Sequence, residues 1–448
     1  MKQLLAKVHE RLGDLWWYSL MIFVACRSGD VIQAFIGLWL VPKYVGPEEL
    51  GAVLPLQQLT SFLTVPLAVL ATVFAKYVNT YATRGEYGKV RSFIHDVLWT
   101  ACGVFLICIV IAYLVIPHFY VRLNVASGML TVLILAAGFA SNIANLFTSA
   151  LQGLKKFKTM TIQNLISAPI RLATLLVAMP IRALSGYILG QATPPATCSL
   201  LAAWSLHKDL KSIPLDTSWR KDLPEIWRYL WPVAVYVGSG ALFSVISATI
   251  YRQRLPDIES AAYYLLSRFS EIAGYIGASM MIILIPLASE AHERGDEKPK
   301  FLRQTLIGTA ASTIVLAIAF AIFGSAILNL SDVWRQYASY VGLLPCLTII
   351  TGSSTFISSI VTYEMACRRF AIATFIILVN LCWTIFIVSF TGYEYFRGLL
   401  PNGFVDWMGS IHLARLSTMI WATIIVEVIQ ISVIPFILRG SRKILIYE

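Results

Sequence analysis

Twelve long apolar runs constrain this chain more than any other feature. A helix needs about 20 predominantly apolar residues to cross the roughly 30 Å hydrocarbon core of a bilayer. Such runs fall at 17–41, 53–77, 93–118, 126–153, 158–180 and 183–205, and again at 231–251, 260–290, 302–330, 336–366, 371–391 and 411–437. Because a helix satisfies its backbone polar groups internally, the sequence predicts an all-α polytopic membrane protein with twelve transmembrane helices.

The composition excludes a soluble globular domain. Hydrophobic residues make up 58% of the 448 residues, charged residues make up only 13%, and the mean hydropathy is +0.72. A soluble fold of this size could not cover so much apolar surface with so few charges. The seven cysteines are scattered without a C-x-x-C pair, which predicts packed side chains rather than disulfides or metal ligands.

The sequence also lacks the motifs of nucleotide and metal chemistry. It contains no G-x-x-x-x-G-K-S/T, no H-E-x-x-H, and no stretch outside the apolar runs long enough to form a catalytic domain. We therefore expect a monomer that is not an enzyme, that carries no cofactor or metal, and that binds no nucleic acid. Any transport would then use an ion gradient or run downhill.

Basic residues are distributed unevenly between alternate connections. The termini and the even-numbered connections carry 24 of the 35 Lys and Arg residues, whereas the odd-numbered connections carry 7. Connections rich in Lys and Arg stay in the cytoplasm, so both termini are predicted to be cytoplasmic. The remaining four arginines lie inside apolar runs: Arg27, Arg171, Arg268 and Arg415.

Polar stretches divide the chain into four predicted regions. Residues 1–16 are too polar for a signal peptide and predict an amphipathic helix that lies on the membrane surface. Residues 17–205 form a predicted N-terminal six-helix bundle, and residues 231–448 form a C-terminal one. Between them, the basic stretch 206–230 predicts a cytoplasmic linker.

The two halves repeat one another at a shift of 210 residues. This shift places Glu49 on Glu259 and Arg84 on Arg294 without a gap. Six runs separate the copies, so both start in the same orientation, and the two bundles are predicted to be related by a pseudo-two-fold axis along the membrane normal. Transporters with this arrangement rock two lobes around a central cavity.

Several segments resemble one known family. They are VPKYVGPEELGAVLPLQQ after the first run, TRGEYGKV after the second, ALQGLKKFKTMTIQNLI between the fourth and fifth, and DIESAAYYLLSRFSEI with IPLASEAHERGD in the second half. These segments resemble the polysaccharide and oligosaccharide flippases of the multidrug/oligosaccharidyl-lipid/polysaccharide exporter superfamily. The resemblance implies twelve helices around a V-shaped cavity, alternating access, and translocation of an undecaprenyl-diphosphate-linked saccharide across a bacterial inner membrane. It implies no catalytic residue.

Ionisable residues inside the membrane are costly and are the first candidates for a functional site. Arg27 with Asp30, and Arg268 with Glu271, are spaced three residues apart and so share a helix face. Both pairs are predicted to line a substrate cavity, where arginine could hold a diphosphate through bidentate hydrogen bonds. The alternative is a structural ion pair between helices.

Other polar residues of the runs leave two interpretations open. Arg171 follows Pro169 and either lines the cavity or satisfies carbonyls that the proline frees. Glu427 is either a hydrogen-bonded acid or a coupling-ion site. Small and amide side chains either bind sugar hydroxyls or join helices; those predicted to line the cavity are Gln57, Gln58, Asn142 and Asn145.

Three functions follow from these features. The first is a flippase that moves a lipid-linked oligosaccharide through a basic, polar cavity, for cell-surface polysaccharide biosynthesis. The second is a multidrug antiporter coupled to protons or sodium, which needs an acidic cavity; its candidate ion-coupling residues are Asp30, Glu271 and Glu427. The third is a membrane glycan polymerase or transferase, for which the sequence offers little support.

Overall fold

The computed structural model describes residues 32, 34–123, 128–293, 300–367, 369–391 and 415–444. The predicted surface helix 1–16, Arg27 and Asp30 lie outside the described residues.

Helices account for nearly all of the described chain. Those of the first half are η1 (Ile36–Leu40), α2 (Val41–Tyr44), α3 (Pro47–Leu63), α4 (Val65–Thr83), α5 (Tyr87–Leu123), α6 (Gly128–Gly153), α7 (Phe157–Ala178) and α8 (Ala183–Leu210). Those of the second half are η2 (Thr217–Asp222), α9 (Leu223–Arg254), α10 (Asp257–Glu293), α11 (Lys300–Leu328), α12 (Asp332–Arg335), η3 (Ala338–Leu343), α13 (Leu344–Ala366), α14 (Ala371–Thr391) and α16 (Leu416–Ile444). The described residues form no strand.

The helices match the predicted runs. Each run from the second to the twelfth corresponds to a helix or a bent pair of helices, and the described end of the first run is also helical. Among the described residues, seven helices are individually long and apolar enough to cross a membrane, and nine qualify if each bent pair counts as one span. The prediction of an all-α polytopic membrane protein is confirmed.

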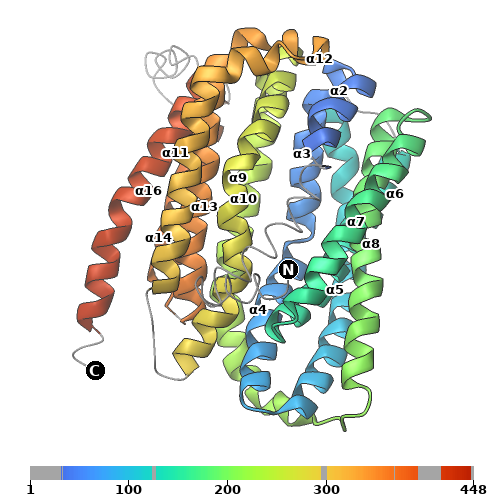
Figure 1. Ribbon diagram of the computed structural model, residues 1–448, viewed down its shortest axis with the longest axis vertical. Helices are drawn as coiled ribbons and strands as arrows, with labels where there is room; N and C mark the ends of the chain where they lie inside the picture. Colours follow the sequence, from blue (N-terminus) through green and yellow to red (C-terminus); the bar gives the residue numbers. More distant parts are fainter. Residues whose placement is uncertain are drawn as a thin grey trace, which may run out of the picture.

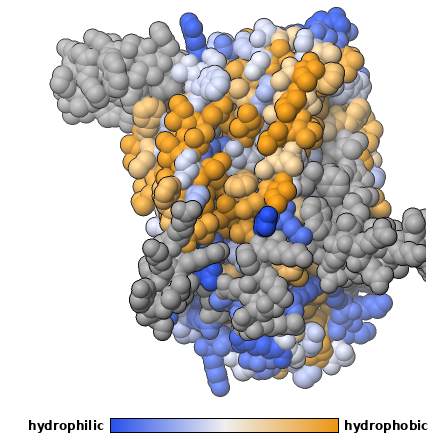
Figure 2. Space-filling view, turned by 60° about the vertical axis from the view of Figure 1, so that its left-hand side comes forward, coloured by the Kyte–Doolittle hydropathy of each residue, from blue (hydrophilic) through white to orange (hydrophobic). Residues whose placement is uncertain are grey.

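The surface carries a hydrophobic band between two hydrophilic ends (Figure 2). On α11 the side chains of Ile314, Val315, Ile318 and Ile322 are each at least 55% exposed. A soluble protein would bury such a row of large apolar residues, whereas a bilayer solvates it. These helices therefore present their apolar faces to lipid.

Helix packing in the second half repeats that of the first. In the first half α4 packs on α6, α5 packs on α6, α6 packs on α8 and α7 packs on α8. The equivalent pairs in the second half are α10 on α13, α11 on α13, α13 on α16 and α14 on α16. The two sets of helices lie side by side, with α3 and α4 of one half facing α9 and α10 of the other (Figure 1).

The second helix of each half is bent at an equivalent position. The chain turns by 60° between α3 and α4 at Thr64, and α10 turns by 49° at Ile276. Pro66 lies at the start of α4, where it cannot supply a backbone N–H to a continuous helix. Gly274 and Gly277 flank the bend in α10, and glycine is a common cause of kinks. Both bends lie where the two halves meet.

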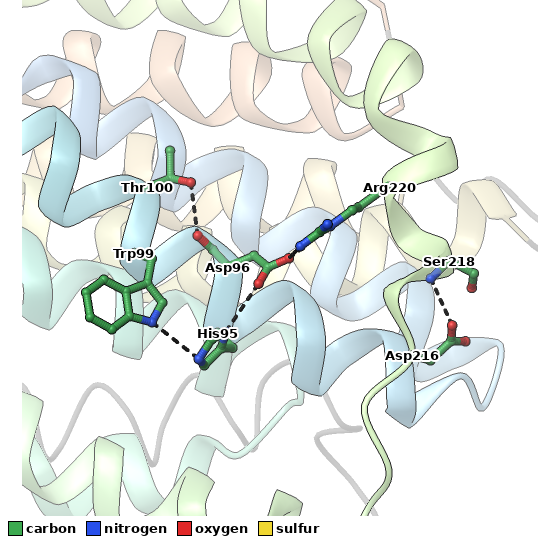
Figure 3. Close-up of polar contacts among 7 residues, drawn as sticks. All are labelled: His95, Asp96, Trp99, Thr100, Asp216, Ser218 and Arg220. Atoms are coloured by element: carbon green, nitrogen blue, oxygen red, sulfur yellow. Dashed lines mark hydrogen bonds and ion pairs between the residues drawn. The ribbon is translucent and has the colours of Figure 1, made fainter.

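The predicted linker 206–230 includes the end of one helix and the beginning of the next. Helix α8 continues to Leu210 and α9 begins at Leu223, so only residues 211–222 lie between these two helices. The carboxylate of Asp216 accepts a hydrogen bond from the backbone N–H of Ser218 at 2.9 Å and begins the short helix η2 (Figure 3). This hydrogen bond holds the pKa of the Asp216 carboxyl below its usual value.

The linker is fastened to the first half. Arg220 donates from Nη2 to Oδ2 of Asp96 on α5 at 2.9 Å, and His95 Nδ1 lies 3.2 Å from the other oxygen of the same carboxylate (Figure 3). Trp219 is buried and packs against Phe93, with the ring centroids 5.0 Å apart. The linker therefore packs on the surface of α5.

Candidate functional site

A cavity of about 450 Å³ lies between the two halves, and we call it the seam cavity. Helices α3, α4, α6 and α8 of the first half and α10 of the second half line it. Six of the residues that the sequence singled out are among its lining: Gln57, Gln58, Asn142, Asn145, Arg268 and Glu271.

A chain of polar contacts crosses the seam inside this cavity. Arg268 on α10 pairs with Glu271, with Nη1 and Oε1 2.6 Å apart, and its Nη2 donates to the side-chain oxygen of Gln57 on α3. The amide nitrogen of Gln57 donates in turn to the hydroxyl of Tyr187 on α8 at 2.6 Å. The guanidinium also lies 5.0 Å from the ring of Tyr264. Arg268 of the second half thus contacts α3 of the first half directly and is linked to α8 through Gln57.

The geometry around Arg268 includes an irregular stretch of the first helix. The π-helix η1 places Gly37 against Arg268, and a Cβ on Gly37 would meet Cδ of that side chain at 3.5 Å. Single-turn π-helices are frequent at functional sites. No periodicity in the sequence marks this position, so sequence reasoning missed it.

Arg171 lies behind the lining of the seam cavity. It is not among the lining residues, but its electrostatic neighbours are Tyr187, Tyr264, Arg268 and Glu271. Its Nε and Nη2 atoms are buried and have no hydrogen-bond partner among the described residues. Two guanidinium groups therefore lie within electrostatic range of one carboxylate, which is paired with Arg268, and these three described groups carry a net positive charge.

The amide residues of the seam cavity play different roles. Asn142 is buried, and its amide nitrogen donates to the carbonyl of Gly138 one turn earlier at 2.7 Å. Its side-chain oxygen has no hydrogen-bond partner among the described residues. Asn145 is exposed to the cavity. Further along α6, Gln152 donates to the backbone carbonyl of Ile282 at 2.6 Å. The polar stripe of α6 thus serves both the cavity and the packing of helices.

A second cavity, of about 480 Å³, lies among α9, α13, α14 and α16, and we call it the carboxylate cavity. It contains Glu427, whose side chain accepts a hydrogen bond from Ser354. The other oxygen of Glu427 is buried without a hydrogen-bond partner among the described residues. Nearby, Gln430 donates to Asn380 at 2.9 Å. Sequence reasoning missed Asn380 and Gln430, although Gln430 is three residues from Glu427.

The two cavities meet at the bend between α3 and α4. Ser61 and Ala68 line both of them, and Thr64 at the bend lines the seam cavity. The helix break therefore connects a charged network on one side to a lone carboxylate on the other. It is the element through which the two sites could influence one another.

Contacts between the halves lie at both ends of the seam. At one end Ser260 donates to the carbonyl of Gly51 at 3.4 Å. At the other end Lys76 donates to the carbonyl of Ala366 at 3.2 Å, and Lys155 pairs with Glu290. The cavities lie between these two sets of contacts.

No protein-family model and no curated relative matches the sequence, but solved structures match nearly the whole chain. A variant of the Vibrio cholerae MATE transporter VcmN is 11% identical, with 98% of each chain covered and a TM-score of 0.70. An outward-facing multidrug resistance MATE family transporter of the MOP superfamily is 13% identical, covers 98% of this chain and 97% of its own, and has a TM-score of 0.66.

A third match comes from Pyrococcus furiosus. It is a MOP superfamily transporter for which a reversed polarity of the binding pocket suggests a different function; it is 13% identical, covers 98% of this chain and 97% of its own, and has a TM-score of 0.65. The chain therefore has the fold of these transporters.

Proposed function

We propose that this protein is a membrane transporter that moves its substrate by alternating access of the two bundles, driven by an ion gradient. The observation that carries the proposal is the Arg268 network, which crosses the seam inside a cavity of suitable size for an organic ligand. The fold shared with MATE transporters supports it.

The network gives substrate binding a means to move the two halves. An anionic group of the substrate would compete with Glu271 for the guanidinium of Arg268, and substrate hydroxyls would compete for Gln57. Because the contact between Arg268 and Gln57 joins the second half to the first, replacing it with substrate contacts would loosen the seam. Differential contact with two states is what a ligand needs to shift their populations.

The carboxylate cavity offers a place for the coupling ion. Glu427 is 7% exposed and has one oxygen without a hydrogen-bond partner among the described residues. A buried carboxylate is stabilised by a proton or a cation. Since Ser61 and Ala68 line both cavities, ion binding at Glu427 would be felt at the bend beside the substrate.

The first candidate substrate is an undecaprenyl-diphosphate-linked oligosaccharide, flipped across a bacterial inner membrane for cell-surface polysaccharide biosynthesis. Arg268 pairs with Glu271 while Arg171 lies within electrostatic range of the same carboxylate, so a diphosphate would meet a net positive site. Gln58 and Asn145 line the same cavity and could bind sugar hydroxyls. Both termini would lie in the cytoplasm.

The second candidate is an ion-coupled multidrug antiporter. The matched MATE transporters favour it at least as strongly as the first, since one of them is described as a multidrug resistance transporter. The carboxylate of Glu271 is also 37% exposed, so a cationic compound could reach it in the seam cavity. The two candidates differ in which member of the ion pair contacts the substrate.

Transport in proteoliposomes separates the candidates. The protein is reconstituted with either a fluorescent lipid-linked saccharide or a cationic dye, and Arg268→Gln is compared with wild type. A flippase loses saccharide flipping in this variant. Ion-driven efflux of the dye that survives Arg268→Gln would instead establish the antiporter and exclude the flippase. Arg335→Gln, at an exposed arginine outside both cavities, is the matched control.

A further inference from the structure

A third cavity lies at one end of the first half, separate from the seam cavity and the carboxylate cavity. The turn between α6 and α7 and the last turns of α8 enclose about 460 Å³. Four lysines line this cavity together with a single carboxylate, and we call it the lysine cavity: Lys155, Lys156, Lys158, Lys208 and Asp209. The hydroxyl-bearing residues Thr159 and Ser205 also line it.

Only two of the four lysines have carboxylate partners among the described residues. Lys156 pairs with Asp209, and Lys155 pairs with Glu290 of α10. Lys158 and Lys208 are exposed and unpaired within the described part of the chain. Burial lowers the pKa of the Lys156 ammonium, even though a carboxylate lies beside it. The cavity therefore keeps an excess of two positive charges, and an anion would stabilise it.

Helix stability accounts for one of these lysines but not for Lys156 and Lys158. Lys208 lies in the last turn of α8, where a cation interacts favourably with the helix dipole. In contrast, Lys156 occupies the N-cap position of α7 without a side-chain capping bond, and Lys158 is in the first turn, where the dipole disfavours cations. The positive-inside rule accounts for basic residues in this connection. It does not require that they line a cavity together with hydroxyl-bearing and aromatic side chains.

An apolar track leads from each unpaired lysine into the hydrophobic band. On α8, Trp204 lies four residues before Lys208 and Leu200 lies eight residues before it; their side chains are 68% and 73% exposed. Trp204 also lies under the Lys208 ammonium, 5.9 Å from it. Exposed tryptophans next to basic residues are typical of the level at which lipid headgroups begin.

The matching track runs along α7, which packs against α8. Ile162 and Ile166 follow Lys158 at four-residue intervals and are 45% and 41% exposed. Residues four apart share a helix face, so both helices present a lysine at the cavity and apolar side chains beyond it. The two tracks together form a surface with a cationic head and an apolar tail.

We propose that the lysine cavity binds the phosphodiester headgroup of an anionic phospholipid, whose acyl chains lie along α7 and α8 beyond Trp204. Basic pockets between membrane helices bind such headgroups, and each nearby lysine strengthens the attraction. The ammonium groups of Lys158 and Lys208 contact the phosphate, and the hydroxyls of Thr159 and Ser205 are available to the glycerol part. This site is independent of the substrate proposed for the seam.

Native mass spectrometry of the full chain in neutral detergent tests the proposal. Dissociation constants are measured for phosphatidylglycerol, phosphatidylcholine and inorganic phosphate. Wild type is expected to bind phosphatidylglycerol more tightly than phosphatidylcholine, and the double variant Lys158→Gln/Lys208→Gln should weaken phosphatidylglycerol about 30-fold, roughly fivefold for each lysine. The matched control is Lys211→Gln/Lys221→Gln, which removes the same charge from two exposed linker residues.

Three outcomes would overturn the proposal. Equal affinity of wild type for the two phospholipids would remove the headgroup specificity. If the cavity variant and the linker control lose the same phosphatidylglycerol affinity, the lipid responds to the overall charge of the protein and not to the cavity. If inorganic phosphate binds as tightly as phosphatidylglycerol and Trp204→Ala leaves lipid binding unchanged, the cavity recognises phosphate alone and the apolar tracks on α7 and α8 contribute nothing to binding.

Discussion

The seam cavity and the carboxylate cavity have similar volumes but hold their charges in different ways. In the seam cavity the two terminal guanidinium nitrogens of Arg268 have side-chain partners, whereas its buried Nε has none among the described residues. In the carboxylate cavity Glu427 has one hydroxyl partner and one free oxygen within the described residues. Paired charges can be exchanged against those of a large polar ligand, whereas a single buried carboxylate suits a proton or a small cation. This difference supports the proposal that substrate binds in the first cavity and the coupling ion in the second.

The largest expected effect is that of Arg268→Gln on transport. Loss of the guanidinium removes the charge-assisted bonds to Glu271 and Gln57 and also the group that would hold a substrate anion. Such bonds contribute about 1.5–3 kcal/mol each, so we expect flipping of a lipid-linked saccharide to fall by about 100-fold. Initial rates in proteoliposomes measure this change.

The folded state should tolerate the same substitution. Glu271 is 37% exposed, so cavity water can solvate its carboxylate when the arginine is gone. Gel filtration of Arg268→Gln should therefore give a monodisperse peak at wild-type yield, as should the control Arg335→Gln. If the Arg268→Gln variant flips substrate at the wild-type rate, Arg268 does not bind substrate in the seam cavity.

The second prediction concerns Glu427→Gln and tests the other cavity. The amide keeps the shape of the side chain but cannot take up a proton or neutralise a cation. We expect substrate accumulation driven by an imposed ion gradient to be lost, while substrate binding without a gradient stays within about twofold. Flux and equilibrium binding are measured on the same preparation. Intact gradient-driven accumulation would show that the coupling ion binds elsewhere.

The fold was predictable because a chain that crosses lipid must satisfy its backbone hydrogen bonds internally, which leaves few structures other than a helix. Apolar runs of sufficient length predict the helices, and the 210-residue repeat predicts two bundles of the same orientation. The pairing of Arg268 with Glu271 could be anticipated from their three-residue spacing. These are local or repeated patterns, and a sequence displays them directly.

The rest of the site depends on contacts between distant helices. Gln57 was predicted as a cavity residue, but its bonds to Arg268 and Tyr187 span 211 and 130 residues, and no spacing rule reaches so far. For Arg171 the sequence left cavity lining and carbonyl satisfaction open; it is not among the lining residues of the seam cavity, and its electrostatic neighbours Tyr187 and Tyr264 belong to other helices that no spacing rule reaches. The beginning of α9 at Leu223 could not be read from hydropathy, since Pro224 starts this helix within a polar stretch.

The third prediction tests whether the network works as a unit. Tyr187→Phe removes the acceptor for the Gln57 amide and leaves that amide without this partner, at a cost of about 1 kcal/mol. If Gln57 then holds Arg268 less firmly, substrate affinity should fall by about fivefold. Tyr87→Phe, at an exposed tyrosine at the start of α5, is the control. An unchanged substrate affinity in Tyr187→Phe would confine the network to Arg268, Glu271 and Gln57.

The smallest expected effect is that of Ser354→Ala, which removes the hydroxyl that donates to Glu427. A hydroxyl that occupies one carboxylate oxygen competes with an incoming ion for the same electron pairs. Without it, the ion concentration that gives half-maximal transport should fall by about threefold, which corresponds to part of one hydrogen bond. Ser239→Ala is the control, because Ser239 donates to the carbonyl of Tyr236 in its own helix. If both variants behave alike, the hydroxyl of Ser354 only supports helix packing, and the carboxylate cavity binds its ion through Glu427 without help from α13.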